Sequence, residues 1–131
     1  MDMIWYDTLL KPEYTPESWI FTPAWLFLYG LIILSLLVYK NTDTDKNKIA
    51  GYVYFSIQIV LNFLWTPVFF ALHNIVLSFT IICFMTVFVV LNIIEFYKVS
   101  KISAALLVPY VLWICFAAYL NYGFMMLNSV K

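Results

Sequence analysis

The sequence has little charge. Aspartate, glutamate, lysine and arginine make up 11% of its 131 residues, and hydrophobic residues make up 65%. A water-soluble globular domain has about 25% charged residues. Together with a mean hydropathy of +0.93, this composition excludes an ordinary soluble domain and indicates a protein of the lipid bilayer.

Several functional signals are also missing. The chain has one histidine, two cysteines, no cluster of metal-ligating residues and no basic patch, and its net charge of zero argues against nucleic-acid binding. Residues 1–17 hold four acids, one lysine and no apolar core. They do not resemble a removable signal peptide, so we expect the N-terminus to be mature as written. Cys83 and Cys115 lie in apolar runs, where cysteine serves as a small packing residue.

The chain does contain four long apolar runs. Asp, Glu, Lys, Arg and His are absent from the intervals 18–39, 49–72, 74–94 and 102–130. Each run is long enough for the roughly 20 residues of a membrane-spanning helix, and none alternates in polarity as the strands of a β-barrel do. We therefore predict an all-α, polytopic transmembrane bundle, one domain over 1–131, with helices at about 19–39, 49–72, 74–96 and 102–127.

Lysines indicate the orientation of this bundle in the membrane. Lys11 and Lys131 lie on one side, and the connectors on the other side carry Lys40, Lys46, Lys48, Lys98 and Lys101. By the positive-inside tendency the two connectors are cytoplasmic and both termini are extracytoplasmic.

Polar and aromatic residues recur at helical spacing in three of the predicted helices. The stripe in helix 49–72 consists of Gln58, Asn62, Trp65 and Phe69. The stripe in helix 102–127 consists of Leu106, Tyr110, Trp113, Ala117 and Asn121, and the stripe in helix 19–39 consists of Trp25, Tyr29 and Ile32. We expect these stripes to face inward, because an amide in hydrocarbon needs hydrogen-bond partners.

Simpler interpretations of these residues stay open. Gln58, Asn62 and Asn121 can serve only to join helices, and Trp19 and Trp25 can be anchors at the membrane interface.

Prolines and serines mark expected irregularities of the helices. Pro23 suits the first turn of its helix, whereas Pro67 and Pro109 lie inside helices and should bend them. Either Ser100 or Ser103 is a candidate N-cap for the last helix.

Three segments carry a more specific signal: WYDTLLKPEYTPESWIFTPAWLFLY, QIVLNFLWTPVFF and FYKVSKISAALLVPYVLWICFAAYLNY. In content, order and separation they resemble the signature blocks of the TspO/MBR family. This family comprises the tryptophan-rich sensory proteins and includes the translocator protein, or peripheral-type benzodiazepine receptor. The resemblance runs from Trp5 to about Tyr122.

The resemblance implies a bundle of five helices, usually dimeric, with a pocket between helices. In the family this pocket accepts porphyrins, isoquinoline-type and benzodiazepine-type drugs and, in some members, cholesterol. The segment 1–18 then corresponds to the long first loop, a lid over the pocket, and its prolines reduce the entropy of ordering such a lid.

Carried over by position, the resemblance assigns roles to individual residues. The pocket tryptophans fall on Trp25 and Trp113, and the helix amide falls on Asn62. The lid tyrosine falls on Tyr6, and the small residue whose enlargement perturbs ligand or sterol binding falls on Ala117.

The sequence also departs from the family pattern. Only four residues precede Trp5, so one of the family's five helices is missing from this sequence. Either the protein is a four-helix member of the family or the given start of the sequence omits a segment. In the lid, Tyr14 and Glu17 replace a tryptophan and a proline. In the sterol motif, Met126 replaces the basic residue, so sterol binding is not expected to be the purpose of the protein.

The leading hypothesis is an integral membrane, sensory or transport-type protein that binds a porphyrin-type tetrapyrrole in an aromatic intramembrane pocket. The macrocycle is expected to be buried against Trp25, Trp65 and Trp113, with Asn62 hydrogen-bonding its polar edge. The candidate ligand-binding residues are Tyr6, Trp25, Asn62, Trp65, Tyr110, Trp113, Ala117 and Asn121. We expect a homodimer in a lipid bilayer, no required cofactor, no metal site and no catalytic residue. Isoquinoline-type or benzodiazepine-type drugs are further ligands that the resemblance implies. By the same resemblance, light-dependent degradation of porphyrin is a possible activity of the protein.

Two other functions remain as alternatives. A sensory or scaffolding protein that acts through a protein partner, without its own ligand, predicts that the stripes pack shut. A small proton-coupled multidrug exporter needs a carboxylate embedded in the membrane. Glu95 and His73 lie only at predicted helix ends, and Glu95 has no expected partner there, so the exporter is the weaker alternative.

Overall fold

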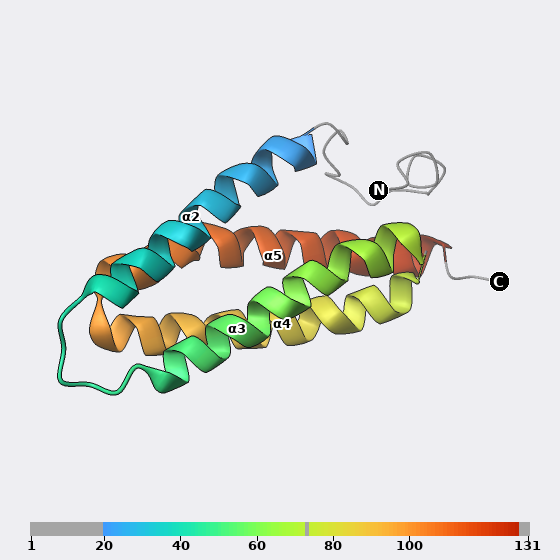
Figure 1. Cartoon of the computed structure of the whole chain (residues 1–131). Helices are drawn as coiled ribbons and strands as arrows, with labels where there is room; N and C mark the ends of the chain where they lie inside the picture. Colours follow the sequence, from blue (N-terminus) through green and yellow to red (C-terminus); the bar gives the residue numbers. More distant parts are fainter. Residues whose placement is uncertain (1–19, 73, 129–131) are drawn as a thin grey trace.

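The computed structural model describes residues 20–72 and 74–128, and this part of the chain is almost entirely helical (Figure 1). Its elements are α2 (Phe21–Asn41), α3 (Ile49–Thr66), the π-helical turn η2 (Pro67–Ala71), α4 (Ile75–Val99) and α5 (Lys101–Asn128). Within these residues, four helical spans are long and apolar enough to cross a membrane. The predicted all-α transmembrane bundle is confirmed, and each predicted helix overlaps an observed one.

Prolines lie where the sequence predicts irregular helix geometry. Pro23 lies in the first turn of α2, where its missing N–H costs little. Pro67 begins η2, and the Leu72 N–H donates to Pro67 O at 3.0 Å, which is the wider bond of a π-helix. Pro109 lies inside α5, which continues for several turns beyond it. The irregularity at Pro67 is therefore a widened turn at the end of α3.

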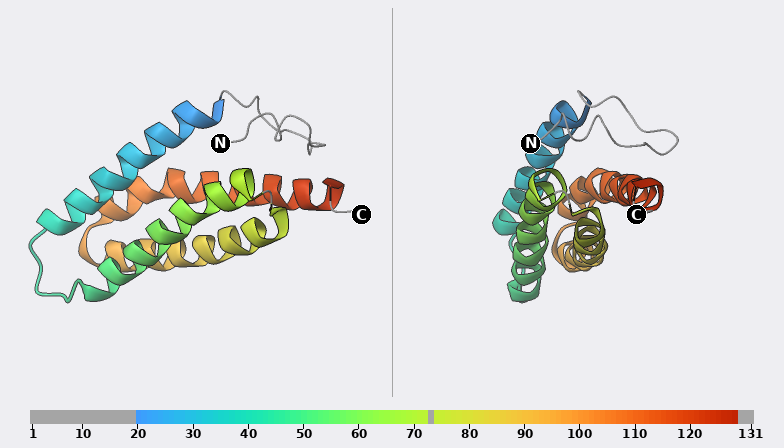
Figure 2. Two further views of the ribbon diagram at one scale, coloured as in Figure 1. Left: turned by 45° about the vertical axis from the view of Figure 1, so that its right-hand side comes forward. Right: turned by 90° about the vertical axis from the view of Figure 1, so that its right-hand side faces the viewer.

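The packing of the bundle is built around α4 and α5. α4 packs against α3 and α5, and α2 packs on α5. Figures 1 and 2 show that α2 crosses α5 at an angle, with its N-terminal end standing away from the other helices. The buried side of α4 is a stripe at helical spacing, formed by Ser78, Ile82, Met85, Val89, Asn92 and Phe96.

The two lysine-bearing connectors meet at one end of the bundle (Figure 1). Lys46 Nζ donates to the carbonyl oxygen of Lys98 at 2.7 Å, which joins the first connector to the end of α4. The expectation that these lysines share one side is confirmed. The side of the membrane that they face stays a prediction.

Serines fasten α5 at the same end. The Ser103 N–H donates to Ser100 Oγ at 3.2 Å, so Ser100 is the N-cap of α5. The Ser103 hydroxyl instead donates to Ser35 O of α2 at 2.7 Å, and the Ser35 hydroxyl donates to Ser103 O at 2.7 Å. Both side chains are fully buried. This reciprocal pair holds α2 against α5.

Candidate functional site

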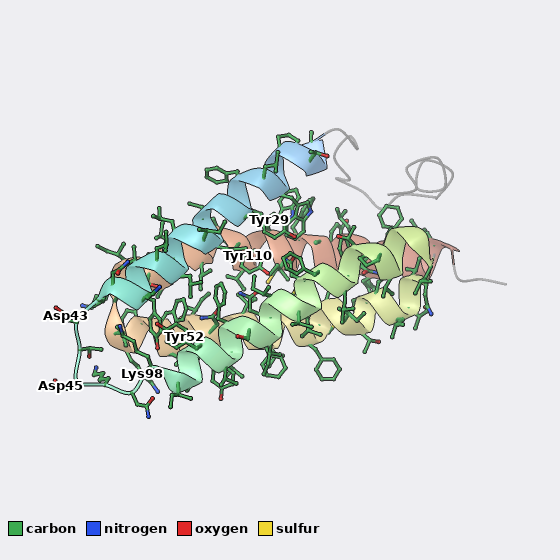
Figure 3. All side chains as sticks on the ribbon, in the orientation of Figure 1. Tyr29, Asp43, Asp45, Tyr52, Lys98 and Tyr110 are labelled. Atoms are coloured by element: carbon green, nitrogen blue, oxygen red, sulfur yellow. The ribbon has the colours of Figure 1, made fainter. Side chains whose placement is uncertain are left out.

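Aromatic rings from three helices converge on Trp25 of α2. The centroid of its ring lies 5.7 Å from Tyr29, 6.5 Å from Trp65 of α3, 6.5 Å from Tyr110 of α5 and 6.2 Å from Trp113 of α5. We call these five residues the aromatic cluster. In Figure 3, Tyr29 and Tyr110 lie close together between α2 and the rest of the bundle.

The rings of the aromatic cluster meet at different angles. Trp113 and Tyr110 stand edge-on to Trp25, at 88° and 71°, whereas Tyr29 and Trp65 are tilted by only 32° and 39°. Aromatic pairs favour such tilted and edge-to-face arrangements over a face-to-face stack. Tyr110 is fully buried, and the other four residues are half-buried. The cluster thus has a buried base and a partly accessible aromatic surface.

A chain of hydrogen bonds runs behind the aromatic cluster. The Tyr29 hydroxyl donates to Asn62 Oδ1, and Asn62 Nδ2 donates to Tyr110 Oη at 2.8 Å. The Tyr110 hydroxyl donates to Gln58 Oε1 at 2.7 Å, and Gln58 Nε2 donates to Asn92 Oδ1 at 3.4 Å. We call these five residues the polar chain. It connects all four helices and begins at a member of the aromatic cluster.

The polar chain ends inside the bundle at Asn92 of α4. This side chain is fully buried, and its Nδ2 has no hydrogen-bond partner in the described part of the chain. An unsatisfied buried donor costs about 1–3 kcal/mol. The inner end of the polar chain is therefore its weakest point, whereas its other end, at Tyr29, is half-buried.

A second polar group fixes Trp65. Its indole N–H donates to Asn121 Oδ1 of α5 at 3.0 Å, and Asn121 Nδ2 donates to the carbonyl oxygen of Ile75 in α4 at 3.1 Å. The Ser78 hydroxyl lies 3.1 Å from the same Asn121 oxygen. Asn121 thus positions an indole ring of the cluster by linking three helices.

The structure brings most of the predicted site residues together. Trp25, Trp65, Tyr110 and Trp113 belong to the aromatic cluster. The other predicted residues within the described range are buried: Asn62, Asn121 and Ala117. Tyr6 lies outside the described residues.

The three stripes face inward as predicted. Gln58, Asn62 and Phe69 are buried, and so are Ile32, Tyr110, Ala117 and Asn121. One detail differs: Leu107 is fully buried, whereas Leu106 is half-buried. The direct bonds between amides and aromatic side chains show that these amides join helices and also position rings.

Four residues of the site were not among the predicted site residues. Tyr29 and Gln58 were predicted to face inward but were not assigned to the site. Asn92 and Ser78 were missed altogether, although each is a polar residue in an apolar helix. Their spacing of 14 residues places both on one side of α4, and this was the available signal.

Glu95 has a charged partner, which the sequence analysis did not expect. Its Oε2 forms an ion pair with Lys98 Nζ at 2.9 Å, one helical turn further along α4. The expectation that Glu95 has no partner was wrong, because a spacing of three residues places the two side chains on the same face of the helix. Among the described residues, no group of three or more His, Cys, Asp or Glu side chains could hold a metal ion. His73 lies outside the described residues.

Comparisons with known proteins agree with the sequence signature. A profile of the TspO/MBR family matches residues 1–127. The tryptophan-rich protein TspO of Chlorobaculum tepidum is 37% identical over 125 residues, which are 95% of this chain and 79% of that protein. The tryptophan-rich sensory protein of Cereibacter sphaeroides is 33% identical over 124 residues, 95% of this chain and 77% of that protein. The human translocator protein is 31% identical over 121 residues, 90% of this chain and 71% of that protein. The chain is an integral membrane protein and belongs to the TspO/MBR family.

Proposed function

We propose that this protein binds a flat, largely apolar ligand of the tetrapyrrole class at the aromatic cluster. A sensory or transport-type role would follow from that binding. The observation that carries this proposal is the meeting of three half-buried indoles, Trp25, Trp65 and Trp113, within one group of helices. The names of two similar proteins, a sensory protein and a translocator protein, support the broader role.

Physical chemistry favours a planar ligand at such a place. Aromatic side chains offer large apolar areas, and each well-placed ring pair contributes about 0.5–1.5 kcal/mol beyond the burial of area. Rings that meet both edge-on and tilted can contact a macrocycle on its face and at its rim. Ligand sites are typically apolar with a few placed polar groups, and the polar chain supplies such a group at Tyr29.

A second candidate is a sensory or scaffolding protein that acts through a protein partner and has no ligand of its own. One observation favours it: the cluster rings contact one another, and Tyr110 beneath them is fully buried. A tightly packed aromatic core has the same contacts. The two candidates therefore differ in whether the half-buried indole surface takes up a ligand.

The test is a titration of detergent-solubilised protein with protoporphyrin IX, followed by quenching of tryptophan fluorescence. We expect saturable quenching. Trp113→Phe and Asn62→Ala should each weaken binding by about 1 kcal/mol or more, which is about fivefold in Kd, because one loses ring contact and the other loses the support of Tyr29.

A matched control is Phe84→Leu, which removes an aromatic ring that is 56% exposed on α4 and should leave the Kd unchanged. Absence of saturable quenching in the unchanged protein would favour the scaffolding candidate. Equal affinities of Trp113→Phe and the control would place the porphyrin elsewhere.

A further inference from the structure

The hydroxyl group of Tyr29 is where the polar chain reaches the aromatic cluster. We infer that Tyr29 contacts the polar edge of the ligand as a hydrogen-bond acceptor, and so selects planar ligands that carry an O–H or N–H donor at that edge. This inference rests on the proposed function. It concerns the chemistry of the ligand, which ring contacts alone leave unspecified.

The first step concerns the single proton of the Tyr29 hydroxyl. A phenol has one proton to donate and lone pairs that accept. That proton is donated to Asn62 Oδ1 on α3. The part of the hydroxyl left for a ligand is therefore an oxygen lone pair.

The second step concerns what holds this arrangement. Asn62 Nδ2 donates onward to Tyr110, and the Tyr110 hydroxyl donates onward to Gln58. All three of these side chains are buried, with at most 3% exposure. Turning the Tyr29 proton outward would require Asn62 to find another donor or to turn its amide. A turned amide would present its oxygen to Tyr110, so the Tyr110 hydroxyl would also have to turn its proton away from Gln58. Linked hydrogen bonds of this kind reinforce one another in a medium of low dielectric constant.

The third step concerns the other polar groups beside the aromatic cluster. The Trp65 N–H donates to Asn121, and the Tyr110 hydroxyl is fully buried. Tyr29 is half-buried, and its ring lies 5.7 Å from Trp25 and 6.2 Å from Phe63. The other residues of the cluster and the polar chain that carry a hydroxyl or an amide are buried. Tyr29 is the one hydroxyl-bearing or amide-bearing residue among them that is half-buried.

Together these steps define the matching ligand group. A protonated carboxylic acid or an alcohol at the edge of the ring can donate to the Tyr29 oxygen, whereas an ester or ether cannot. Asn62 then acts as a positioning residue, because it keeps the tyrosine proton turned inward.

The test compares the affinities of protoporphyrin IX and its dimethyl ester, which have the same ring but differ in the acid O–H. Both are titrated at about pH 4, below the usual pKa of a carboxyl group of about 4.3, so that much of the acid carries its proton. The quantity measured is the ratio of the ester Kd to the acid Kd. Tyr29→Phe should lower this ratio about fivefold, the effect of one lost hydrogen bond of about 1 kcal/mol. Asn62→Leu should also lower it, because the freed Tyr29 proton can then donate to the ester carbonyl. Tyr54→Phe, whose ring lies beside Phe88, is the matched control and should keep the ratio.

The outcomes separate the inference from the proposed function. If the unchanged protein binds neither porphyrin, the proposed function fails and the inference fails with it. If it binds both and Tyr29→Phe keeps the ratio, the inference alone is overturned. If Tyr29→Phe loses its helical circular dichroism, the ratio in Asn62→Leu decides, because a purely structural role of Asn62 would weaken both ligands equally.

Discussion

Single residues decide how closely the helices approach at the lysine-bearing end. Gly51 of α3 is buried, and a Cβ atom added there would lie 2.8 Å from Tyr39 Cζ and 3.3 Å from Phe96 Cδ1. The Tyr39 ring is stacked on Phe96 at 3.9 Å, and its hydroxyl donates to Lys48 O at 3.1 Å. Tyr39 is 1% exposed, so it has little room to move away.

The first stability prediction concerns this glycine. Gly51→Ala should destabilise the protein by about 1–3 kcal/mol, because the methyl group overpacks a filled contact. Thermal unfolding in detergent, followed by circular dichroism, measures the effect.

Gly30 provides the matched control in α2. It has no neighbouring atom within 4 Å of an added Cβ, so Gly30→Ala should stabilise the helix by about 0.5–1 kcal/mol. If Gly51→Ala and Gly30→Ala unfold at the same temperature, the close contact at Gly51 does not limit the stability of the protein.

At the scale of helices, two hydrogen bonds hold α2 to the bundle at Ser35 and Ser103. Each hydroxyl donates to the backbone carbonyl of the other residue at 2.7 Å, in a fully buried setting. At the other end of α2, contact depends on rings and on the bond from Tyr29 to Asn62. The serine pair therefore sets the position from which α2 carries Trp25 to the cluster.

The second stability prediction concerns this pair. Ser35→Ala should cost about 0.6 kcal/mol, and at most about 1.7 kcal/mol, the range measured for hydrogen bonds between transmembrane helices. The same thermal unfolding experiment measures the change. Ser56→Ala is the matched control, because the exposed Ser56 hydroxyl donates only to Tyr52 O of its own helix at 2.8 Å. If Ser56→Ala loses as much stability as Ser35→Ala, the serine pair has no specific role in holding α2.

At the scale of the whole molecule, charge is concentrated at one end. Figure 3 shows Asp43 and Asp45 on the connector between α2 and α3, with Lys98 of α4 near the same end. Lys46 and Lys48 donate to backbone carbonyls there. The positive-inside tendency predicts that this end faces the cytoplasm.

Cysteine labelling tests that orientation in a chain whose Cys83 and Cys115 are replaced by alanine. A membrane-impermeant maleimide should label Leu72→Cys in intact spheroplasts. Leu72 directly follows η2, at the end of the α3 span that is far from the lysine-bearing connector, and it is 68% exposed. Thr44→Cys, in the connector between α2 and α3, should be labelled only after lysis. The reverse pattern would place the lysines outside.

The sequence by itself determined the class of this protein. Four apolar runs without Asp, Glu, Lys, Arg or His require membrane-spanning helices. Amides at helical spacing must turn inward because lipid offers them no partner. Those two facts, with the signature segments, determined the bundle, the three inward stripes and the family. They also placed Trp25, Asn62 and Trp113 among the site candidates.

Only the tertiary structure decided which inward residues meet. Tyr29 and Asn62 are 33 residues apart and Asn62 and Tyr110 are 48 apart, and periodicity gives the face of a helix but not the angle or depth at which two faces pack. The inward side of α4 was harder to identify, because apolar residues lie on every side of this helix and only Ser78 and Asn92 mark the side that packs against protein. The acceptor role that we infer for Tyr29 depends on those contacts, because its proton acquires a direction only when Asn62 lies beside it.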